Sequence, residues 1–138
     1  MDFDPACLSP EERSSMRLRA LYRQRGYTQY RMSKFEEYDL YVQNKDFLVS
    51  NQVITFTDLT GKLMALKPDV TLSILKNNRP DPQELHKFYY DEQVYRIPKA
   101  AKTYKEIRQV GLECIGPVDQ YSCLEVLSLA AASLRALS

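Results

Sequence analysis

The sequence predicts an α+β fold in which an antiparallel sheet is flanked by helices. Two long runs typical of strands, residues 87–96 and 104–115, are joined by the short loop PKAAKT. Strands joined by so short a loop pair antiparallel, because a parallel pair needs a crossover of about a dozen residues or more. Helical patterns stand on both sides of these strands, and 138 residues suffice for one core. We therefore expect a single domain over residues 1–138.

The first helix has distinct start and stop signals. Ser9 can act as its N-cap, Pro10 suits the first helical position, and Glu12 completes a capping box. Gly26 is expected to end the helix. An apolar stripe at helical spacing is expected to face the core: Leu18, Leu21 and Tyr22.

The middle of the chain predicts a hairpin and a short helix. VITFTDLTGKLMAL has two β-rich arms around a turn in which Gly61 can take a positive φ. KPDVTLSILKNN follows at once and predicts a short helix that begins near Asp69. After the two long strands, residues 119–136 predict a closing helix. Its apolar residues recur at helical spacing: Leu124, Leu127, Ala131 and Leu134.

Composition excludes several classes of function. The net charge of +1 gives no general attraction to nucleic acid or to an anionic membrane. No apolar run approaches the ~20 residues of a membrane span, and MDFDPACLSPEER lacks the regions of a signal peptide, so we expect a cytoplasmic protein. Three widely spaced cysteines, Cys7, Cys114 and Cys123, and the single His86 fit neither a disulfide framework nor a metal site.

The two faces of EIRQVGLECIG differ in character. One face is suited to the core and carries Val110, Leu112 and Cys114. The other face carries Gly111 between Gln109 and Glu113. Glycine weakens a strand interior and often marks the close approach of a ligand or another backbone. From Gln109 to Glu113 the strand spans roughly 13 Å, about the reach of one amino acid. This face could therefore hold a small ligand above a bare glycine, or it could be a polar sheet face covered by water or a loop.

Three segments of the chain are KLMALKPDVTLSILKN, FYYDEQVYR and YKEIRQVGLECIG, in this order. Together they resemble the front half of the catalytic core of class II aminoacyl-tRNA synthetases of the histidyl type. They are also similar to the synthetase-like regulatory subunit of ATP phosphoribosyltransferase, the first enzyme of histidine biosynthesis. RGYTQYRMSKFEEYDLY resembles the first class II motif, a helix and strand at the dimer interface. The resemblance implies a class II core with motifs 1 and 2 only, and a homodimer formed through the motif 1 region.

The resemblance also implies a binding site for L-histidine. Asp69 and Thr71 match the family's histidine-binding stretch, and the aspartate is more typical of the regulatory relatives than of the synthetases. Gln109 and Glu113 match residues that hold the ligand's side chain and amino group, and Arg96 matches the second-motif arginine. Without the resemblance, Asp69 could simply cap the next helix, Thr71 could face solvent, and Arg96 could be a surface charge.

The departures from the synthetase pattern concern ATP. After Arg96 the chain reads IPKAAKT, where a synthetase has an acidic residue and a Gly-Arg pair. Ile107 and Arg108 precede Gln109 in place of an aromatic that stacks on adenine. The third class II motif and the second histidine signature are not found in these 138 residues. In the first motif, Ser33 replaces the usual proline. We therefore expect no catalytic residues, no cofactor and no metal.

Two functional hypotheses follow. The first is a non-catalytic regulatory subunit that senses histidine and acts through the catalytic subunit of ATP phosphoribosyltransferase. The second is the N-terminal part of a histidyl-tRNA synthetase, which would use ATP, Mg²⁺ and tRNA. A partial domain with neither activity is a third possibility. An aromatic cluster in the first motif is expected to divide between an interface and the core: Tyr27, Tyr30, Phe35, Tyr38 and Tyr41.

Overall fold

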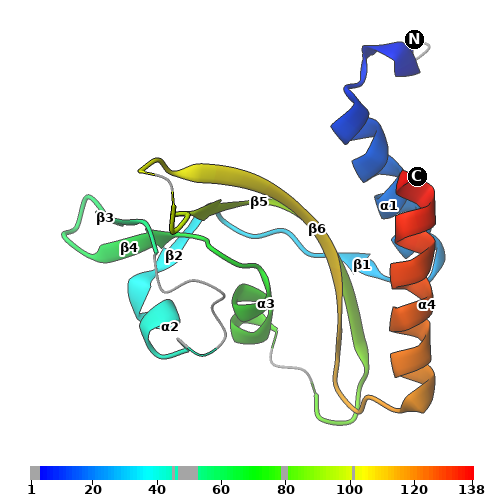
Figure 1. Cartoon of the computed structure of the whole chain (residues 1–138). Helices are drawn as coiled ribbons and strands as arrows, with labels where there is room; N and C mark the ends of the chain where they lie inside the picture. Colours follow the sequence, from blue (N-terminus) through cyan, green and yellow to red (C-terminus); the bar gives the residue numbers. More distant parts are fainter. Residues whose placement is uncertain (1–3, 45, 47–52, 79–80, 101) are drawn as a thin grey trace. The chain divides into compact units, whose positions relative to one another are not determined.

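The computed structural model describes residues 4–44, 46, 53–78, 81–100 and 102–138, and its α+β architecture of antiparallel sheets and flanking helices confirms the predicted fold class. Within the described residues, no helix combines the length and the apolarity needed to cross a membrane. The elements follow one another as shown in Figure 1: η1 (Pro5–Cys7), α1 (Pro10–Gln24), β1 (Thr28–Gln29), β2 (Phe35–Glu37), α2 (Tyr38–Val42), β3 (Thr55–Thr57), β4 (Leu63–Leu66), α3 (Thr71–Asn77), β5 (His86–Arg96), β6 (Lys105–Ile115) and α4 (Gln120–Leu137).

The chain divides into two compact units. The first unit comprises Met1–Gln29, Pro80–Asp91 and Val110–Ser138. The second unit comprises Tyr30–Arg79 and Glu92–Gln109. Strands β5 and β6 therefore contribute their residues to both units. They pair with each other, and the short connection between them makes the pair antiparallel, as the sequence predicted.

Helix α1 of the first unit begins with the predicted capping box. The Ser9 hydroxyl accepts a hydrogen bond from the Glu12 amide at 3.2 Å, and the Glu12 carboxylate accepts one from the Ser9 amide at 2.8 Å. These bonds satisfy two N–H groups that a helix start would otherwise leave without partners. Gly26, at φ 81°, follows the end of the helix, a left-handed conformation that glycine adopts without a steric penalty.

The core of the first unit lies between its helices and the sheet β1-β5-β6. Helices α1 and α4 lie side by side (Figure 1), and the hydroxyls of Tyr22 and Ser133 are 2.8 Å apart. Val110 and Leu112 of β6 pack against the core, which confirms the predicted core face of that strand. Asp119 caps α4 by accepting a hydrogen bond from the Ser122 amide at 2.8 Å. The buried cluster consists of Leu18, Tyr22, Tyr27, Tyr89 and Leu129.

The second unit contains the antiparallel sheet β2-β4-β3. The predicted hairpin is confirmed as β3 and β4, and Gly61 has φ 84° in the turn between them. Phe35 of β2 lies opposite Leu66 of β4, and Phe56 of β3 lies opposite Met64. A small core forms beside this sheet, and its buried members are Tyr41, Ala65 and Leu72.

The aromatic cluster of the first motif divides between the interior and the surface, and its predicted role in an interface stays a prediction. Tyr27 is buried in the first unit and Tyr41 in the second, with exposed fractions of 3% and 1%. Tyr30 and Tyr38 are partly buried. Phe35 is 46% exposed and packs edge-on against Phe56, with ring centroids 5.5 Å apart. Only this part of the cluster therefore remains available as an apolar surface.

An ion pair joins β5 to α4 in the first unit. The Lys87 ammonium lies 2.7 Å from the Glu125 carboxylate and 5.6 Å from the centre of the Tyr27 ring. The hydrogen bond from Lys87 lowers the pKa of Glu125, and the same bond raises the pKa of Lys87. Burial, together with the nearby Glu125 charge, raises the pKa of the Tyr27 phenol.

We expect this pair to make stability pH-dependent at both extremes. Because the pKa of Glu125 is lowered in the folded state, its contribution is complete above the unfolded value of about 4.3 and disappears as pH falls through the folded value. Because the pKa of Lys87 is raised, its contribution is complete below about 10.4 and disappears as pH rises through the folded value. Glu125→Gln should therefore cost about 1 kcal/mol at neutral pH and should make the acid limb of the stability curve shallower. Urea unfolding measured across the acid range checks this, and an unchanged acid limb would contradict it.

Candidate functional site

Strand β5 holds the segment Lys67–Thr71 in the second unit. The Tyr95 amide donates a hydrogen bond to the Lys67 carbonyl at 2.9 Å. The neighbouring Arg96 donates through Nε to the Pro68 carbonyl at 3.2 Å. The structure therefore places Arg96 beside the segment that carries Asp69 and Thr71. These are three of the five predicted site residues.

A buried ion pair completes this attachment. Lys67 is 1% exposed, and its ammonium pairs with the carboxylate of Glu92 on β5. The same carboxylate accepts a hydrogen bond from the Met32 amide at 3.3 Å. A buried ammonium without a partner would be very costly, so this pair restricts where the segment can lie. Neither Lys67 nor Glu92 was among the predicted site residues.

Helix α3 begins near Asp69, as predicted. Its first residue is Thr71, with Val70 at the N-cap and no side-chain capping bond, so Asp69 does not cap it. The alternative reading of Asp69 as a capping residue is therefore wrong. Asp69 instead lies near the phenol of Tyr41, whose pKa is raised first by burial and then by the charges of Glu36 and Asp69.

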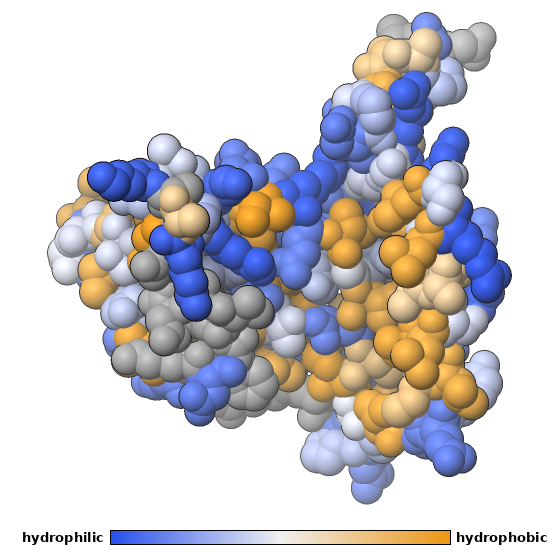
Figure 2. Space-filling view, viewed as in Figure 1, coloured by the Kyte–Doolittle hydropathy of each residue, from blue (hydrophilic) through white to orange (hydrophobic). Residues whose placement is uncertain are grey.

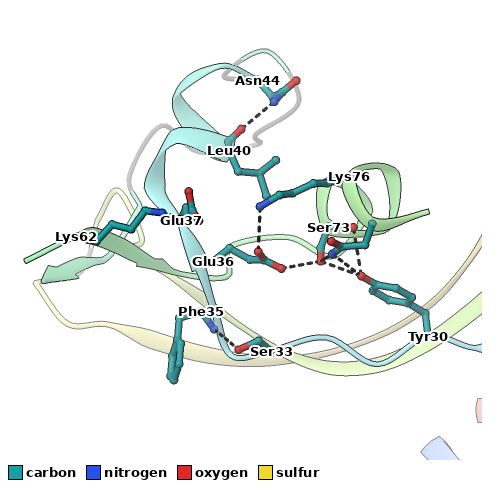
Figure 3. A network of polar contacts seen from close by, with 11 residues as sticks. Tyr30, Ser33, Phe35, Glu36, Glu37, Leu40, Asn44, Lys62, Ser73 and Lys76 are labelled. Atoms are coloured by element: carbon teal, nitrogen blue, oxygen red, sulfur yellow. Dashed lines mark hydrogen bonds and ion pairs between the residues drawn. The ribbon is translucent and has the colours of Figure 1, made fainter. Parts of the chain in front are cut away.

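A polar network fixes α3 against β2 and the segment before it (Figure 3). The Tyr30 hydroxyl donates to the Ser73 carbonyl at 3.2 Å, and the Ser73 hydroxyl donates to the Glu36 carboxylate at 3.0 Å. Asn77 donates to the Tyr30 hydroxyl at 3.1 Å, and the Lys76 ammonium lies 3.6 Å from the Glu36 carboxylate. Ser73 has no exposed surface. The network thus sets the position of the helix that starts at Thr71, and its connection to Glu36 of the first motif was not predicted.

Gln109 and Glu113 lie on β6, but in different units. Gln109 belongs to the second unit and Glu113 to the first, and both are partly buried. Within the described part of the chain, the side-chain oxygen of Gln109 is buried without a hydrogen-bond partner. A buried carbonyl oxygen in this state can accept a hydrogen bond from an N–H group of a ligand. Histidine binding by Asp69, Thr71, Arg96, Gln109 and Glu113 stays a prediction.

The space beside Gly111 is not open. A Cβ at this position would collide with the Tyr90 hydroxyl oxygen and lie 2.6 Å from Tyr90 Cζ, and Tyr90 is only 6% exposed. The glycine therefore makes room for an aromatic side chain of the neighbouring strand. The prediction that the space above Gly111 is open to a ligand was wrong. The sequence shows that a side chain is missing at this position, but it does not show which group occupies the space.

The chemistry of these groups suits the binding of a small polar ligand. Carboxylates can hold an ammonium group, and a guanidinium can hold a carboxylate. No group of three or more His, Cys, Asp or Glu side chains that could hold a metal ion occurs among the residues that the structure describes.

Comparisons with known proteins extend over the whole chain. The sequence profile described as histidyl-tRNA synthetase matches residues 1–138. A histidine–tRNA ligase from Methanosarcina acetivorans is 30% identical over 141 residues, which cover 99% of this chain and 34% of that protein. The chain spans about a third or less of the length of the curated relatives that it matches first.

Solved structures share the fold. An ATP phosphoribosyltransferase regulatory subunit/histidyl-tRNA synthetase from Bacillus halodurans has a TM-score of 0.76 at 23% identity, covering 100% of this chain and 36% of that one. The ATP phosphoribosyl transferase (HisG:HisZ) complex from Thermotoga maritima has a TM-score of 0.69 at 21% identity, covering 98% of this chain and 43% of that one. At these identities the likeness shows the fold alone, and it agrees with the predicted class II synthetase-like core.

We expect Lys67→Met to destabilise the protein by about 3–5 kcal/mol, because it leaves the Glu92 carboxylate buried without its partner. The double variant Lys67→Met/Glu92→Gln removes both charges and keeps an acceptor for the Met32 amide, so it should recover most of this loss. Urea unfolding of both variants and of Glu92→Gln completes a double-mutant cycle. Additive losses, with no recovery in the double variant, would contradict the importance of the pair.

Gly111→Ala should cost about 1–3 kcal/mol through overpacking, because the new methyl group collides with the buried Tyr90 ring. In a Tyr90→Leu background the same substitution should cost much less, since the ring is gone. Thermal or urea unfolding of the four proteins tests this coupling. An equal cost in both backgrounds would show that something other than Tyr90 requires the glycine.

Proposed function

The chain belongs to the histidyl-tRNA synthetase family, and on that premise we propose that it is a non-catalytic, histidine-sensing regulatory subunit of ATP phosphoribosyltransferase. It binds L-histidine in the cytoplasm and acts through the catalytic subunit of that enzyme in histidine biosynthesis. The fold likeness to the Thermotoga maritima complex supports a catalytic-subunit partner. Such an effector works by binding two states of the assembly with different affinities.

One observation carries the choice of sensor over enzyme. Ile107 is the residue next to Gln109 on the same face of β6, and it is 39% exposed. A synthetase of this family has an aromatic that stacks on adenine just before the glutamine, whereas Ile107 and Arg108 stand here. An aliphatic side chain cannot replace aromatic stacking. The groups suited to histidine are therefore present in this chain without the residue suited to ATP.

The ligand's charges match the proposed residues. Its α-ammonium group suits the carboxylates of Asp69 and Glu113, and its carboxylate suits Arg96. Its N–H groups suit the Gln109 oxygen, which lacks a hydrogen-bond partner among the described residues. Thr71 would add a hydroxyl at the start of α3.

We also propose that the chain forms a homodimer through the first-motif region. Phe35 and Phe56 pack against each other on the second unit's sheet and remain 46% and 37% exposed. Leu63 of the same sheet is 47% exposed. Exposed aromatic and aliphatic side chains on one sheet are typical of a protein interface. The ion pair between Lys62 and Glu37, at 2.7 Å, is suited to a polar rim.

The alternative function is histidine activation. The Methanosarcina acetivorans relative, 30% identical to this chain, is a histidine–tRNA ligase. In this reading the chain is the N-terminal part of a catalytic core, and histidine is joined to ATP with Mg²⁺ and then to tRNA. The charge at the phosphates would then need stabilisation by arginines and Mg²⁺.

Isothermal titration calorimetry separates the two functions. We expect the chain to bind L-histidine and not ATP·Mg²⁺, and we expect Gln109→Ala or Glu113→Ala to weaken histidine binding at least tenfold, since each removes about 1.4 kcal/mol or more of a charged or buried hydrogen bond. Glu106→Ala is the matched control, because Glu106 lies on the same strand but on its opposite face. It should bind histidine as the parent does.

The outcomes are distinct. ATP binding that Arg96→Ala abolishes, together with histidine-dependent pyrophosphate exchange, would favour the synthetase. Heat signals absent with both ligands would contradict histidine sensing by this chain. Where histidine binds, the catalytic subunit of ATP phosphoribosyltransferase should respond to histidine only when this chain is present.

A further inference from the structure

A pocket in the first unit lies between the last turn of α1 and the strands β1 and β5. Its volume is about 470 Å³, and it is lined by Arg23, Tyr27, Thr28, Gln29 and Tyr89. All five residues belong to the first unit. Pockets that hold small molecules have volumes of roughly 300–1,000 Å³. The pocket is therefore large enough for a small organic ligand, and none of the residues proposed to bind histidine lines it.

The turn after α1 explains why the pocket forms at this place. The Gly26 amide donates a hydrogen bond to the Arg23 carbonyl at 3.1 Å, and the Tyr27 amide donates one to the Tyr22 carbonyl at 3.1 Å. This pair of bonds is the Schellman motif, which ends a helix at a left-handed residue. The chain therefore reverses at Gly26, and β1 begins beside the last turn of α1. Because β1 also pairs with β5, all three elements contribute residues to the pocket.

The parts of the pocket that a ligand can touch are mainly polar. Tyr27 and Tyr89 are 3% and 1% exposed, so they offer a ligand little surface. Arg23 and Thr28 are exposed, and Gln29 is partly buried. A ligand would therefore meet a guanidinium group, a hydroxyl group and an amide. Figure 2 shows the same polar character along the helix, since hydrophilic side chains cover α1, whereas the neighbouring α4 is largely apolar.

Two hydrogen bonds fix the orientation of the Gln29 amide. Its oxygen accepts one from Arg19 Nη2 at 3.3 Å and one from the Tyr89 hydroxyl at 3.5 Å. The oxygen is thereby occupied, and the NH₂ group of the same amide can only donate. The guanidinium group of Arg23 is likewise only a donor. The pocket is therefore suited to a ligand that is rich in hydrogen-bond acceptors.

The charges beside the pocket are positive. Arg19 and Arg23 are four residues apart on α1, so their side chains are neighbours and repel each other. Neither forms an ion pair within the described part of the chain. The acidic residues of α1, Glu11 and Glu12, lie in its first turn, at the other end of the helix. The negative end of a helix dipole amounts to roughly half an elementary charge, which two guanidinium groups exceed. An anion in the pocket would therefore relieve the repulsion.

We propose that this pocket binds a small sugar phosphate, with the phosphate group at Arg23 and beside Arg19. Arginine binds phosphate through paired hydrogen bonds, and a phosphate dianion balances two guanidinium charges where a carboxylate balances one. The Thr28 hydroxyl and the Gln29 NH₂ group suit the hydroxyl groups of a sugar. The volume of the pocket leaves room for the sugar beside the phosphate. The exposed aromatics proposed for the dimer lie in the second unit, so this proposal rests neither on dimerisation nor on histidine binding.

Isothermal titration calorimetry at constant ionic strength tests the proposal, with glucose 6-phosphate as the probe. We expect saturable binding of glucose 6-phosphate, weaker binding of inorganic phosphate and no binding of glucose. Arg23→Gln should weaken the binding of glucose 6-phosphate by about tenfold or more, since it removes charge-assisted hydrogen bonds. Arg13→Gln is the matched control, because Arg13 is exposed on the same helix and does not line the pocket. It removes the same charge and should bind the probe about as tightly as the parent does.

Three results of this experiment would overturn the proposal. The first is the absence of saturable binding of glucose 6-phosphate. The second is equally tight binding of inorganic phosphate, which would show that the sugar makes no contact. The third is an equal loss of affinity in Arg23→Gln and Arg13→Gln, which would indicate a general attraction of anions to a basic surface. Circular dichroism should show unchanged helix content in both variants, because both side chains are exposed.

Nuclear magnetic resonance locates the bound probe. On addition of glucose 6-phosphate, the backbone amide signals of Thr28 and Gln29 should shift, because these residues line the pocket. The signals of Asp58 and Lys62, in the β3–β4 turn of the second unit, should not shift. Arg23→Gln should remove the shifts of Thr28 and Gln29. Shifts confined to residues outside the pocket would overturn the assignment of the site.

Discussion

The buried ion pair between Lys67 and Glu92 positions the segment that bears Asp69 and Thr71. An ammonium group with 1% exposure must lie against a negative charge, so its segment stays beside Glu92 of β5. The hydrogen bonds from Tyr95 and Arg96 to the carbonyls of Lys67 and Pro68 attach the segment to β5 at two further points. The segment that bears Asp69 is therefore positioned by the residues of one strand. Any change in the pairing of β5 would move this segment with it.

The sequence predicts the local elements well, because their signals lie within a few residues of one another. The capping box at Ser9 and the turn glycine Gly61 act on neighbouring residues, so each could be recognised without the rest of the fold. The pair between Lys67 and Glu92 joins residues 25 positions apart, and nothing in either segment indicates which charge meets which. For α4, helical spacing revealed the leucines but not the side that is buried. The buried side carries small residues such as Ser122 and Ser133, through which α1 and α4 approach closely.

At Gly111 the sequence correctly indicates a close approach, but the group predicted to approach was wrong. The missing side chain on β6 does indicate a close approach, as the physical rule states, but the approaching group is Tyr90 from the neighbouring strand. Tyr90 and Gly111 both belong to the first unit, and Tyr90 is only 6% exposed. The glycine is therefore required by packing between neighbouring strands.

Binding an amino acid and activating it make different electrostatic demands. A zwitterion needs one site of each charge, and Asp69, Glu113 and Arg96 supply both signs. Adenylation adds the negative charge of ATP, which requires further cations and a surface for the adenine ring. In this chain Arg96 already donates to the Pro68 carbonyl, and so part of its donor capacity holds the segment of Asp69 in place. An arginine used in this way holds the segment that bears Asp69, whereas Ile107 offers adenine no aromatic surface. The residues therefore favour recognition of histidine over its activation.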